Sequence, residues 1–222
     1  MDYDKYLNPA VAALPPSGIR RFFELASSIR DCISLGVGEP DFVTPWEIRD
    51  AAIKSIQAGK TQYTSNAGLL SLREEIAGYL SARFDAVYEP GSEIIVTIGA
   101  SEAIDLALRT LVRPGDEVLI PSPSYVSYAP NAAITGGVAV AVETSAKNGF
   151  ALTPELLEKA ITPRSKVLIL PYPNNPTGAI MTRAQLEKIA EVAERNDLFV
   201  ISDEIYAELT YGQKHASFAA IP

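Results

Sequence analysis

The sequence has very few of the residues that disulfides, metal sites and membrane spans require. Its 222 residues include one cysteine, one histidine and one tryptophan. Cys32 therefore has no partner for an internal disulfide, which favours a reducing compartment, and no group of cysteines and histidines offers a metal site. No apolar run approaches the roughly 18 residues of a membrane span, and Met1–Lys5 lacks the apolar core of a signal peptide. We expect a soluble, cytoplasmic protein with no membrane partner.

Positive charge is also scarce, with 19 lysines and arginines against 27 acidic residues and a formal net charge of -8. No basic stripe extends beyond Arg20-Arg21, whereas nucleic acids and anionic membranes are bound by clusters of positive charge. We therefore expect no nucleic-acid partner. What the sequence does contain is 47% hydrophobic residues, which is ordinary for a globular protein with a sizeable core.

Apolar runs and helical spacings alternate along most of the chain. Strands are predicted at residues 93–98, 118–120, 138–142, 167–170 and 198–201. Helices are predicted at residues 19–29, 45–59, 72–80, 103–111, 128–134, 154–161 and 182–196. Thr44 is expected to cap the helix that begins at Pro45, and Thr182-Arg183-Ala184-Gln185 has the form of a capping box. The alternation predicts an α/β fold, a mainly parallel sheet with helices on both faces. Residues 1–44 are predicted to form an arm, and residues 45–222 a single domain.

Two polar clusters follow predicted strands, at the edge where parallel sheets bind ligands. Gly99-Ala100-Ser101 joins a strand to a helix, and the free N–H groups there, the serine hydroxyl and the helix dipole suit a phosphate. A plain tight turn with a serine cap explains the same residues. Tyr125 ends the proline-rich turn 121–125, from which its ring can either stack on a planar ligand or pack on its own loop.

Two further loops point to a charged ligand. Asp203 follows the last predicted strand, and a carboxylate there is costly unless a cation or several donors meet it. Tyr206 in the same loop, and Asn175 after strand 167–170, add a phenol and an amide. Together these groups suggest a flat, charged, heteroaromatic ligand. Plainer explanations are that Asp203 caps a helix and that the Asn-Pro pair only shapes a turn, in which Asn174 is as good a functional candidate as Asn175.

Other polar residues have mainly structural explanations. Glu204 is expected to be the solvated partner of a turn. His215, next to Lys214 in a polar loop, is expected to be a solvated surface residue. Cys32 is expected to be a small buried apolar residue.

Taken together, these segments resemble the class I/II aminotransferases, which are fold-type I pyridoxal-phosphate enzymes. The resemblance covers nearly the whole chain in order, and the wording is most similar to the aspartate/aromatic or A-type aminotransferase branch. The segments that carry it are Gly36–Phe42, Tyr63-Thr64 with Gly68, Gly99-Ala100-Ser101, Tyr125, Asn174–Gly178 and Asp203–Tyr206.

The resemblance implies roles around the cofactor ring. Asp203 would pair with the pyridine nitrogen and keep it protonated, so that the ring serves as an electron sink. Asn175 and Tyr206 would bind the phenolic oxygen, and Tyr125 would stack on the ring.

The resemblance also implies contacts beyond the ring. Ala100 and Ser101 would hold the phosphate, and the backbone of Gly38 would contact the substrate carboxylate. Tyr63 would reach the phosphate of a neighbouring subunit, which implies a homodimer with shared active sites. The substrates would be an amino acid and a 2-oxo acid.

The chain departs from the family in one respect. A family lysine forms the Schiff base with the cofactor, in a Ser-x-Ser-Lys-like motif after a later strand, and an arginine further on binds the substrate carboxylate. Lys214 is the lysine nearest to the other motifs, but it follows Tyr211-Gly212 rather than a strand. We therefore expect no catalytic lysine in this chain, which would be an inactive N-terminal portion of a longer enzyme. None of its lysines has that context: Lys5, Lys54, Lys60, Lys147, Lys159, Lys166, Lys188 and Lys214.

Two alternatives keep the cofactor and change the function. Carbon–sulfur lyases and cyclopropane-forming synthases share these motifs, and the residues that select the reaction are largely absent here. A non-catalytic pyridoxal-phosphate-binding or dimerisation module is the other alternative.

Overall fold

The computed structural model describes residues 5–16, 22, 25–26, 28–33, 38 and 42–222. The chain divides into two compact units, one comprising Met1–Ala12 with Ser65–Pro222 and the other Ala13–Thr64. The division into an arm and a domain at residue 44 stays a prediction. In the described part of the chain, no helix combines the length and the apolar character that crossing a membrane requires.

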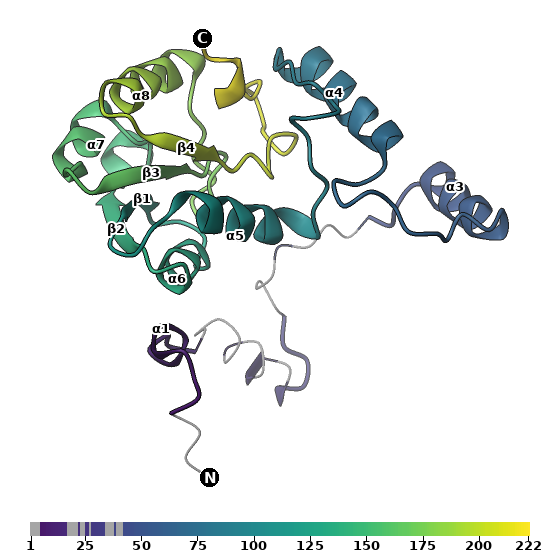
Figure 1. Cartoon of the computed structure of the whole chain (residues 1–222), viewed down its shortest axis with the longest axis horizontal. Coiled ribbons are helices and arrows are strands. Elements are labelled where there is room, and N and C mark those ends of the chain that lie inside the picture. Colours follow the sequence, from purple (N-terminus) through teal and green to yellow (C-terminus); the bar gives the residue numbers. More distant parts are fainter. Residues whose placement is uncertain (1–4, 17–21, 23–24, 27, 34–37, 39–41) are drawn as a thin grey trace. The chain divides into compact units, whose positions relative to one another are not determined.

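The larger unit is built on one parallel sheet in the order β2-β1-β3-β4 (Figure 1). The three pairings are parallel, with Leu119 of β1 beside Val140 of β2 and Leu168 of β3. This confirms the predicted parallel sheet. The strands are β1 (Glu117–Ser122), β2 (Val138–Glu143), β3 (Ser165–Leu170) and β4 (Phe199–Ser202).

The predicted strand at residues 93–98 is wrong, because these residues form a turn, irregular backbone and a bend outside the sheet. The run is rich in β-branched residues, which favours a strand, but a strand also needs a neighbouring backbone along its length. Val96 donates one backbone hydrogen bond to Ala67 (3.0 Å), and no ladder is formed among the described residues. The local β propensity of residues 93–98 is therefore not enough to form a strand without a neighbouring strand to pair with.

Helices cover both faces of the sheet, as predicted. Alternate side chains of each strand point to opposite faces, so Val118 and Val167 pack with α5 and α6, whereas Leu119 and Leu168 pack with α7 and α8. All four side chains are fully buried. Burial of a side chain of this size stabilises the fold by roughly 1.5–3 kcal/mol. The helices of this unit are α1 (Pro9–Ala12), α4 (Leu70–Phe84), α5 (Gly99–Leu111), α6 (Tyr128–Ile134), α7 (Pro154–Ala160) and α8 (Arg183–Arg195), with short 3-10 turns η1 (Ala146–Asn148) and η2 (Phe218–Ala220).

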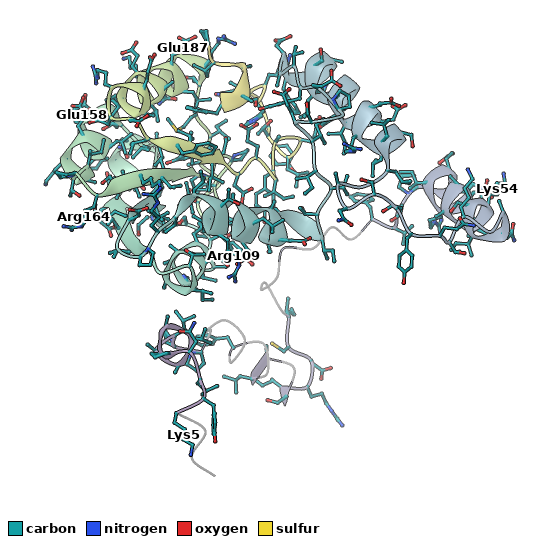
Figure 2. The ribbon with its side chains drawn as sticks, in the orientation of Figure 1. Lys5, Lys54, Arg109, Glu158, Arg164 and Glu187 are labelled. Carbon is teal, nitrogen blue, oxygen red and sulfur yellow. The ribbon has the colours of Figure 1, made fainter. Side chains whose placement is uncertain are left out.

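Charged side chains lie on the outer surfaces of α7 and α8, as Glu158 and Glu187 show (Figure 2). Glu158 pairs with Arg195 across the two helices at 2.7 Å. At the start of α8 the predicted capping box is confirmed, because Thr182 and Gln185 bond to each other's backbone N–H groups. The sequence therefore marks the start of α8 correctly.

The smaller unit contains α3 (Trp46–Gln57), whose start differs from the prediction. Pro45 is the N-cap and Thr44 makes no cap, because Pro45 itself has extended geometry (ψ 145°) and the residue before a proline is kept out of the helical region. Gly59 (φ +70°) follows the helix end as expected. Cys32 is exposed, so its predicted burial is wrong. The predicted helix 19–29 and the glycine-rich segment 36–42 fall largely outside the described residues.

Candidate functional site

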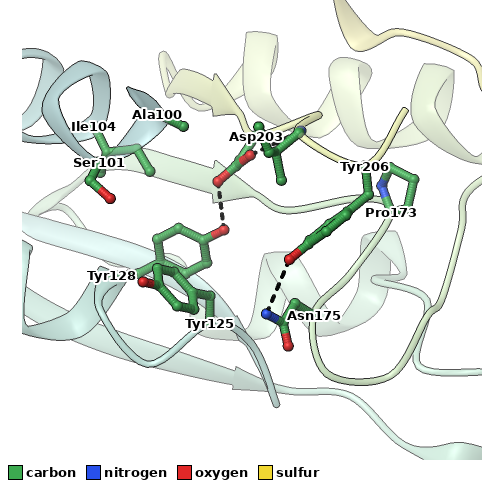
Figure 3. A pocket seen from close by; sticks show the side chains of 10 residues that line it. Ala100, Ser101, Ile104, Tyr125, Tyr128, Pro173, Asn175, Asp203 and Tyr206 are labelled. Atoms are coloured by element: carbon green, nitrogen blue, oxygen red, sulfur yellow. Dashed lines mark hydrogen bonds between the residues drawn. The ribbon is translucent and has the colours of Figure 1, made fainter. Parts of the chain in front are cut away.

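A cavity of about 280 Å³ opens at the carboxyl ends of the strands (Figure 3). The chain leaves β1 toward α6 on one face of the sheet and leaves β3 toward α8 on the other face. The two connections therefore diverge, and a crevice forms at this switch point. The cavity is lined by Ala100, Ser101, Ile104, Tyr125, Tyr128, Pro173, Asn175, Asp203, Ile205 and Tyr206.

The start of α5 forms one wall of the cavity. Gly99 has φ +73°, a value that glycine adopts without strain, and it turns the chain directly into the helix. The first N–H groups of a helix have no acceptor within the helix, and here they belong to the turn that contains Ala100 and Ser101. Glu102 accepts a hydrogen bond from the N–H of Ile98. The first-turn N–H groups of a helix and a serine hydroxyl are groups of the kind that bind anions.

Asp203 lies directly after β4, where its backbone N–H still donates to Leu170 of β3 at 3.1 Å. One carboxylate oxygen, Oδ2, accepts from the Tyr128 hydroxyl at 2.8 Å. The other, Oδ1, accepts from the N–H of Ile205 at 3.2 Å. No helix follows, so Asp203 is not a helix cap. Its carboxylate borders the cavity as an anion with spare acceptor capacity.

The Tyr128 hydroxyl stays protonated. Burial of the phenol raises its pKa well above the ordinary value, and the nearby charge of Asp203 raises it further. A phenol with a raised pKa remains a hydrogen-bond donor over the range in which proteins are stable. Tyr128 was predicted only as the first residue of a helix, and its role as a lining residue was missed. The available signal was a polar-tipped aromatic residue in the first turn of a helix that follows a site loop.

Asn175 and Tyr206 line the cavity together, and the Asn175 amide donates to the Tyr206 hydroxyl over a long 3.5 Å (Figure 3). A bond of this length is weak, so both groups remain available to a ligand. Asn174 is different. It is 5% exposed, its amide donates to the Pro123 carbonyl, and its oxygen accepts from Thr177. Asn174 therefore holds the loop, and Asn175 is the residue that borders the cavity.

The Tyr125 ring packs against a neighbouring residue and also has a face open to the cavity. Its ring packs edge-on against Tyr128, with centroids 5.7 Å apart and an interplanar angle of 81°. It is also 41% exposed and lines the cavity. The ring is thus fixed by a neighbour while part of its surface remains open to a ligand.

The predictions for Glu204 and His215 are wrong, because both side chains are largely buried and are paired with each other. The side chain of His215 is 6% exposed, and its Nε2 lies 2.8 Å from Glu204. Burial acts to raise the pKa of Glu204, but hydrogen bonds from His215, Ser202 and Phe218 outweigh it and hold that pKa below its usual value. Residues 211–214 are exposed, but the chain then folds back so that the His215 side chain turns inward onto Glu204. Lys214 is exposed and does not line the cavity.

Gly38 and Tyr63 belong to the smaller unit. Both are exposed. The roles that the resemblance implies for them stay predictions. The other six predicted cofactor residues line one cavity: Ala100, Ser101, Tyr125, Asn175, Asp203 and Tyr206.

The fold and the cavity define an α/β protein with a polar and aromatic cavity at the carboxyl edge of a parallel sheet. A sequence profile of the family described as aminotransferase class I and II matches residues 30–221. The chain therefore belongs to the class I and II aminotransferase family, whose members use pyridoxal phosphate.

Individual relatives agree with this assignment. The chain is 51% identical over 217 residues to the putative aminotransferase YugH of Bacillus subtilis, covering 98% of this chain and 56% of that protein. It is 43% identical over 207 residues to an aspartate aminotransferase of Pyrococcus abyssi, covering 93% of this chain and 53% of that protein. A solved single mutant of the Thermus thermophilus aspartate aminotransferase has a TM-score of 0.93 at 38% identity, over 97% of this chain and 57% of that one. The chain thus spans a little over half the length of these relatives.

The donor set of the cavity fits the family cofactor. It offers an anion for a protonated ring nitrogen, a helix start for a phosphate, and an amide with a phenol for an anionic oxygen. No lysine lines the cavity in the part of the chain that the structure describes.

Proposed function

We propose that this chain forms the pyridoxal-phosphate-binding part of an aminotransferase, which transfers an amino group between an amino acid and a 2-oxo acid. The observation that carries the proposal is the placement of Asp203 in the same cavity as the start of α5, with Asn175 and Tyr206 beside it. These groups come from segments about a hundred residues apart in sequence, yet they match the separate charges of one small molecule.

Each group has a distinct task in this proposal. Asp203 holds a proton on the ring nitrogen through its negative charge, and Asn175 with Tyr206 binds the phenolic oxygen. Tyr125 covers part of the ring face. Ser101 and the neighbouring N–H of Ala100 bind the phosphate. When bound, pyridoxal phosphate supplies an electron sink that stabilises negative charge at the substrate α-carbon.

Three tasks remain: binding the substrate carboxylate, contacting the phosphate of a second subunit, and supplying the reacting lysine. We propose that groups other than the cavity-lining residues perform them. We place the substrate carboxylate against the backbone of Gly38, and we place Tyr63 at the phosphate site of a second subunit in a cytoplasmic homodimer. The exposure of both residues supports these contacts. Since no lysine of the described chain lines the cavity, we propose that the covalent and proton-transfer work requires a lysine that these 222 residues do not supply.

A second candidate is a non-catalytic pyridoxal-phosphate-binding module. The lack of a lysine among the described residues that line the cavity favours this second candidate. The two candidates differ in whether the protein changes the chemical state of the cofactor.

The test uses the full gene product with added pyridoxal phosphate, amino acids and 2-oxo acids. An aminotransferase converts the cofactor to pyridoxamine phosphate and forms the matching 2-oxo acid. Release of pyruvate and ammonia from a β-substituted amino acid, without that conversion, would instead show a carbon–sulfur lyase. Binding with no chemistry would show the non-catalytic module. Borohydride reduction followed by peptide mapping locates the reacting lysine, and a pyridoxyl group on Lys214 would contradict the proposal that the lysine lies outside these 222 residues.

The cofactor site itself is tested by substitution. Asp203→Asn removes the charge with little change in shape, and we expect pyridoxal phosphate to bind about tenfold more weakly or worse. Asp85→Asn is the matched control, because Asp85 is an exposed aspartate at the end of α4 and does not line the cavity. Equal binding by the two variants would refute the placement of the ring nitrogen.

A further inference from the structure

The hydroxyl of Tyr128 is the only side-chain donor to Asp203 among the described residues, at 2.8 Å from Oδ2 (Figure 3). Tyr128 opens α6, which covers one face of the sheet, and Asp203 follows β4 at the edge of the sheet. Tyr128 is 3% exposed, so water does not compete for this bond. A buried side chain of the core therefore donates directly to the carboxylate that lines the cavity.

The carboxylate plane of Asp203 is fixed at both oxygens. Oδ1 is bound by the backbone N–H of Ile205 at 3.2 Å, and Oδ2 by Tyr128. The Tyr128 ring packs against the ring of Tyr125, with centroids 5.7 Å apart, and belongs to the same buried core as Ile104 and Ile120. Hydrogen bonds at both oxygens, one of them from a buried phenol, restrict rotation of the carboxylate.

We infer that Tyr128 is a positioning residue for Asp203, whose hydroxyl orients the carboxylate toward the ring nitrogen and stabilises its negative charge. This inference rests on the proposed function, because the ring nitrogen belongs to pyridoxal phosphate. Tyr128 acts through Asp203 and is assigned no contact with the ring nitrogen. Its effect is confined to the part of the ligand that Asp203 meets.

The physical reason is competition for one proton. A carboxylate and a pyridine nitrogen in a partly buried site can share a proton either as an ion pair or as a neutral pair, and burial favours the neutral pair. A hydrogen bond donated to the carboxylate favours its charged form, so the proton stays on the nitrogen. Burial and the charge of Asp203 raise the pKa of Tyr128, so the phenol keeps its own proton and stays the donor.

The simpler explanation is that Tyr128 only fills the core. Tyr128→Phe separates the two roles, because it keeps the ring and removes the hydroxyl. Tyr172→Phe is the matched control: Tyr172 is 4% exposed, and its hydroxyl donates to the Phe150 carbonyl at 2.9 Å, away from the cavity. Each variant loses one buried phenol hydrogen bond.

The experiment titrates the full gene product with two compounds, pyridoxal phosphate and its 1-deaza analogue, in which carbon replaces the ring nitrogen. We expect Tyr128→Phe to weaken pyridoxal phosphate binding about tenfold and to leave the analogue within about twofold of wild type. Tyr172→Phe is expected to leave the ratio of the two affinities unchanged. With 15N-labelled pyridoxal phosphate, the nitrogen resonance in Tyr128→Phe is expected to move toward the unprotonated position.

Equal weakening of both compounds by Tyr128→Phe would assign Tyr128 a structural role and overturn the inference. So would an unchanged affinity for both together with an unchanged nitrogen resonance. A wild-type protein that binds neither compound overturns the proposed function, and the inference with it. If Tyr128→Phe lowers folding stability, the Asp203→Asn background resolves the cause, because a loss through folding persists there and a loss through Asp203 does not.

Discussion

Removal of the Glu204 carboxylate is expected to destabilise the fold strongly. Glu204 accepts hydrogen bonds from the hydroxyls of Ser202 (2.7 Å) and Ser217 (3.2 Å), from the N–H of Phe218 (2.9 Å), and pairs with His215 (2.8 Å). Its side chain is 19% exposed. These contacts fasten the segment after β4, including η2, to the end of the sheet.

The magnitude for Glu204→Ala follows from these partners. Four hydrogen bonds at about 1 kcal/mol each, offset by the desolvation that the carboxylate no longer costs, give a net loss of about 3 kcal/mol in the free energy of unfolding. Urea unfolding of the full gene product, followed by circular dichroism, measures it as a lower midpoint with an unchanged slope. Glu158→Ala is the control, because the exposed Glu158–Arg195 pair is worth at most about 1 kcal/mol.

The pH dependence gives a second measurement on the same residue. The pKa of Glu204 is lower in the folded protein than its ordinary value, so the carboxylate adds stability above about pH 4.5, and this stability is lost as the pH falls through the folded pKa. Wild type should therefore lose more stability on acidification than Glu204→Gln. The reasoning is refuted if Glu204→Ala costs no more than Glu158→Ala, or if wild type and Glu204→Gln lose stability in parallel.

Three further substitutions test the fold at independent places. Gly68→Ala should destabilise the protein by about 2 kcal/mol, because Gly68 has φ +92° and the added Cβ would meet Val96 at 2.7 Å; thermal unfolding measures it, and an unchanged midpoint contradicts it. Leu168→Ala should lower the free energy of unfolding, measured with urea, by about 2–5 kcal/mol, since Leu168 is fully buried. A smaller loss would contradict this and mean that the core collapses into the space left by the removed side chain. Arg83→Met should raise the pKa of Glu208 from about 2 toward its ordinary value, because the hydrogen bond from Arg83 is the main cause of the lowering. Carboxyl 13C resonances followed against pH measure that change, and an unmoved titration would contradict it.

Much of the sheet could be predicted because buried parallel strands are nearly continuous apolar runs. The runs around Leu119 and Leu168 needed no other information. The run at residues 93–98 looks the same locally, but whether a run joins a sheet depends on a partner far away in sequence. The start of α8 was predictable for the opposite reason, because a capping box is complete within four residues.

The candidate site was predictable in position and less so in detail. Strand ends in a parallel sheet meet at one edge, so Asp203 and Asn175 were expected near each other before any geometry was known. The choice between Asn174 and Asn175 depends on which side chain the loop turns inward, and local sequence does not encode that. The pairing of Glu204 with His215 across 11 residues depends in the same way on the path of the chain after β4.

The hydrogen bond between Tyr128 and Asp203 joins residues 75 positions apart, which has a consequence for the order in which the protein matures. During synthesis at about 5–20 residues per second, Tyr128 is added to the chain roughly 4–15 seconds before Asp203. In that interval the phenol of Tyr128 has no carboxylate to meet, and the cavity lacks one wall. If pyridoxal phosphate binds to the nascent chain, it should therefore bind late. The start of binding would then show that β4 has paired with β3 and that Asp203 is in place.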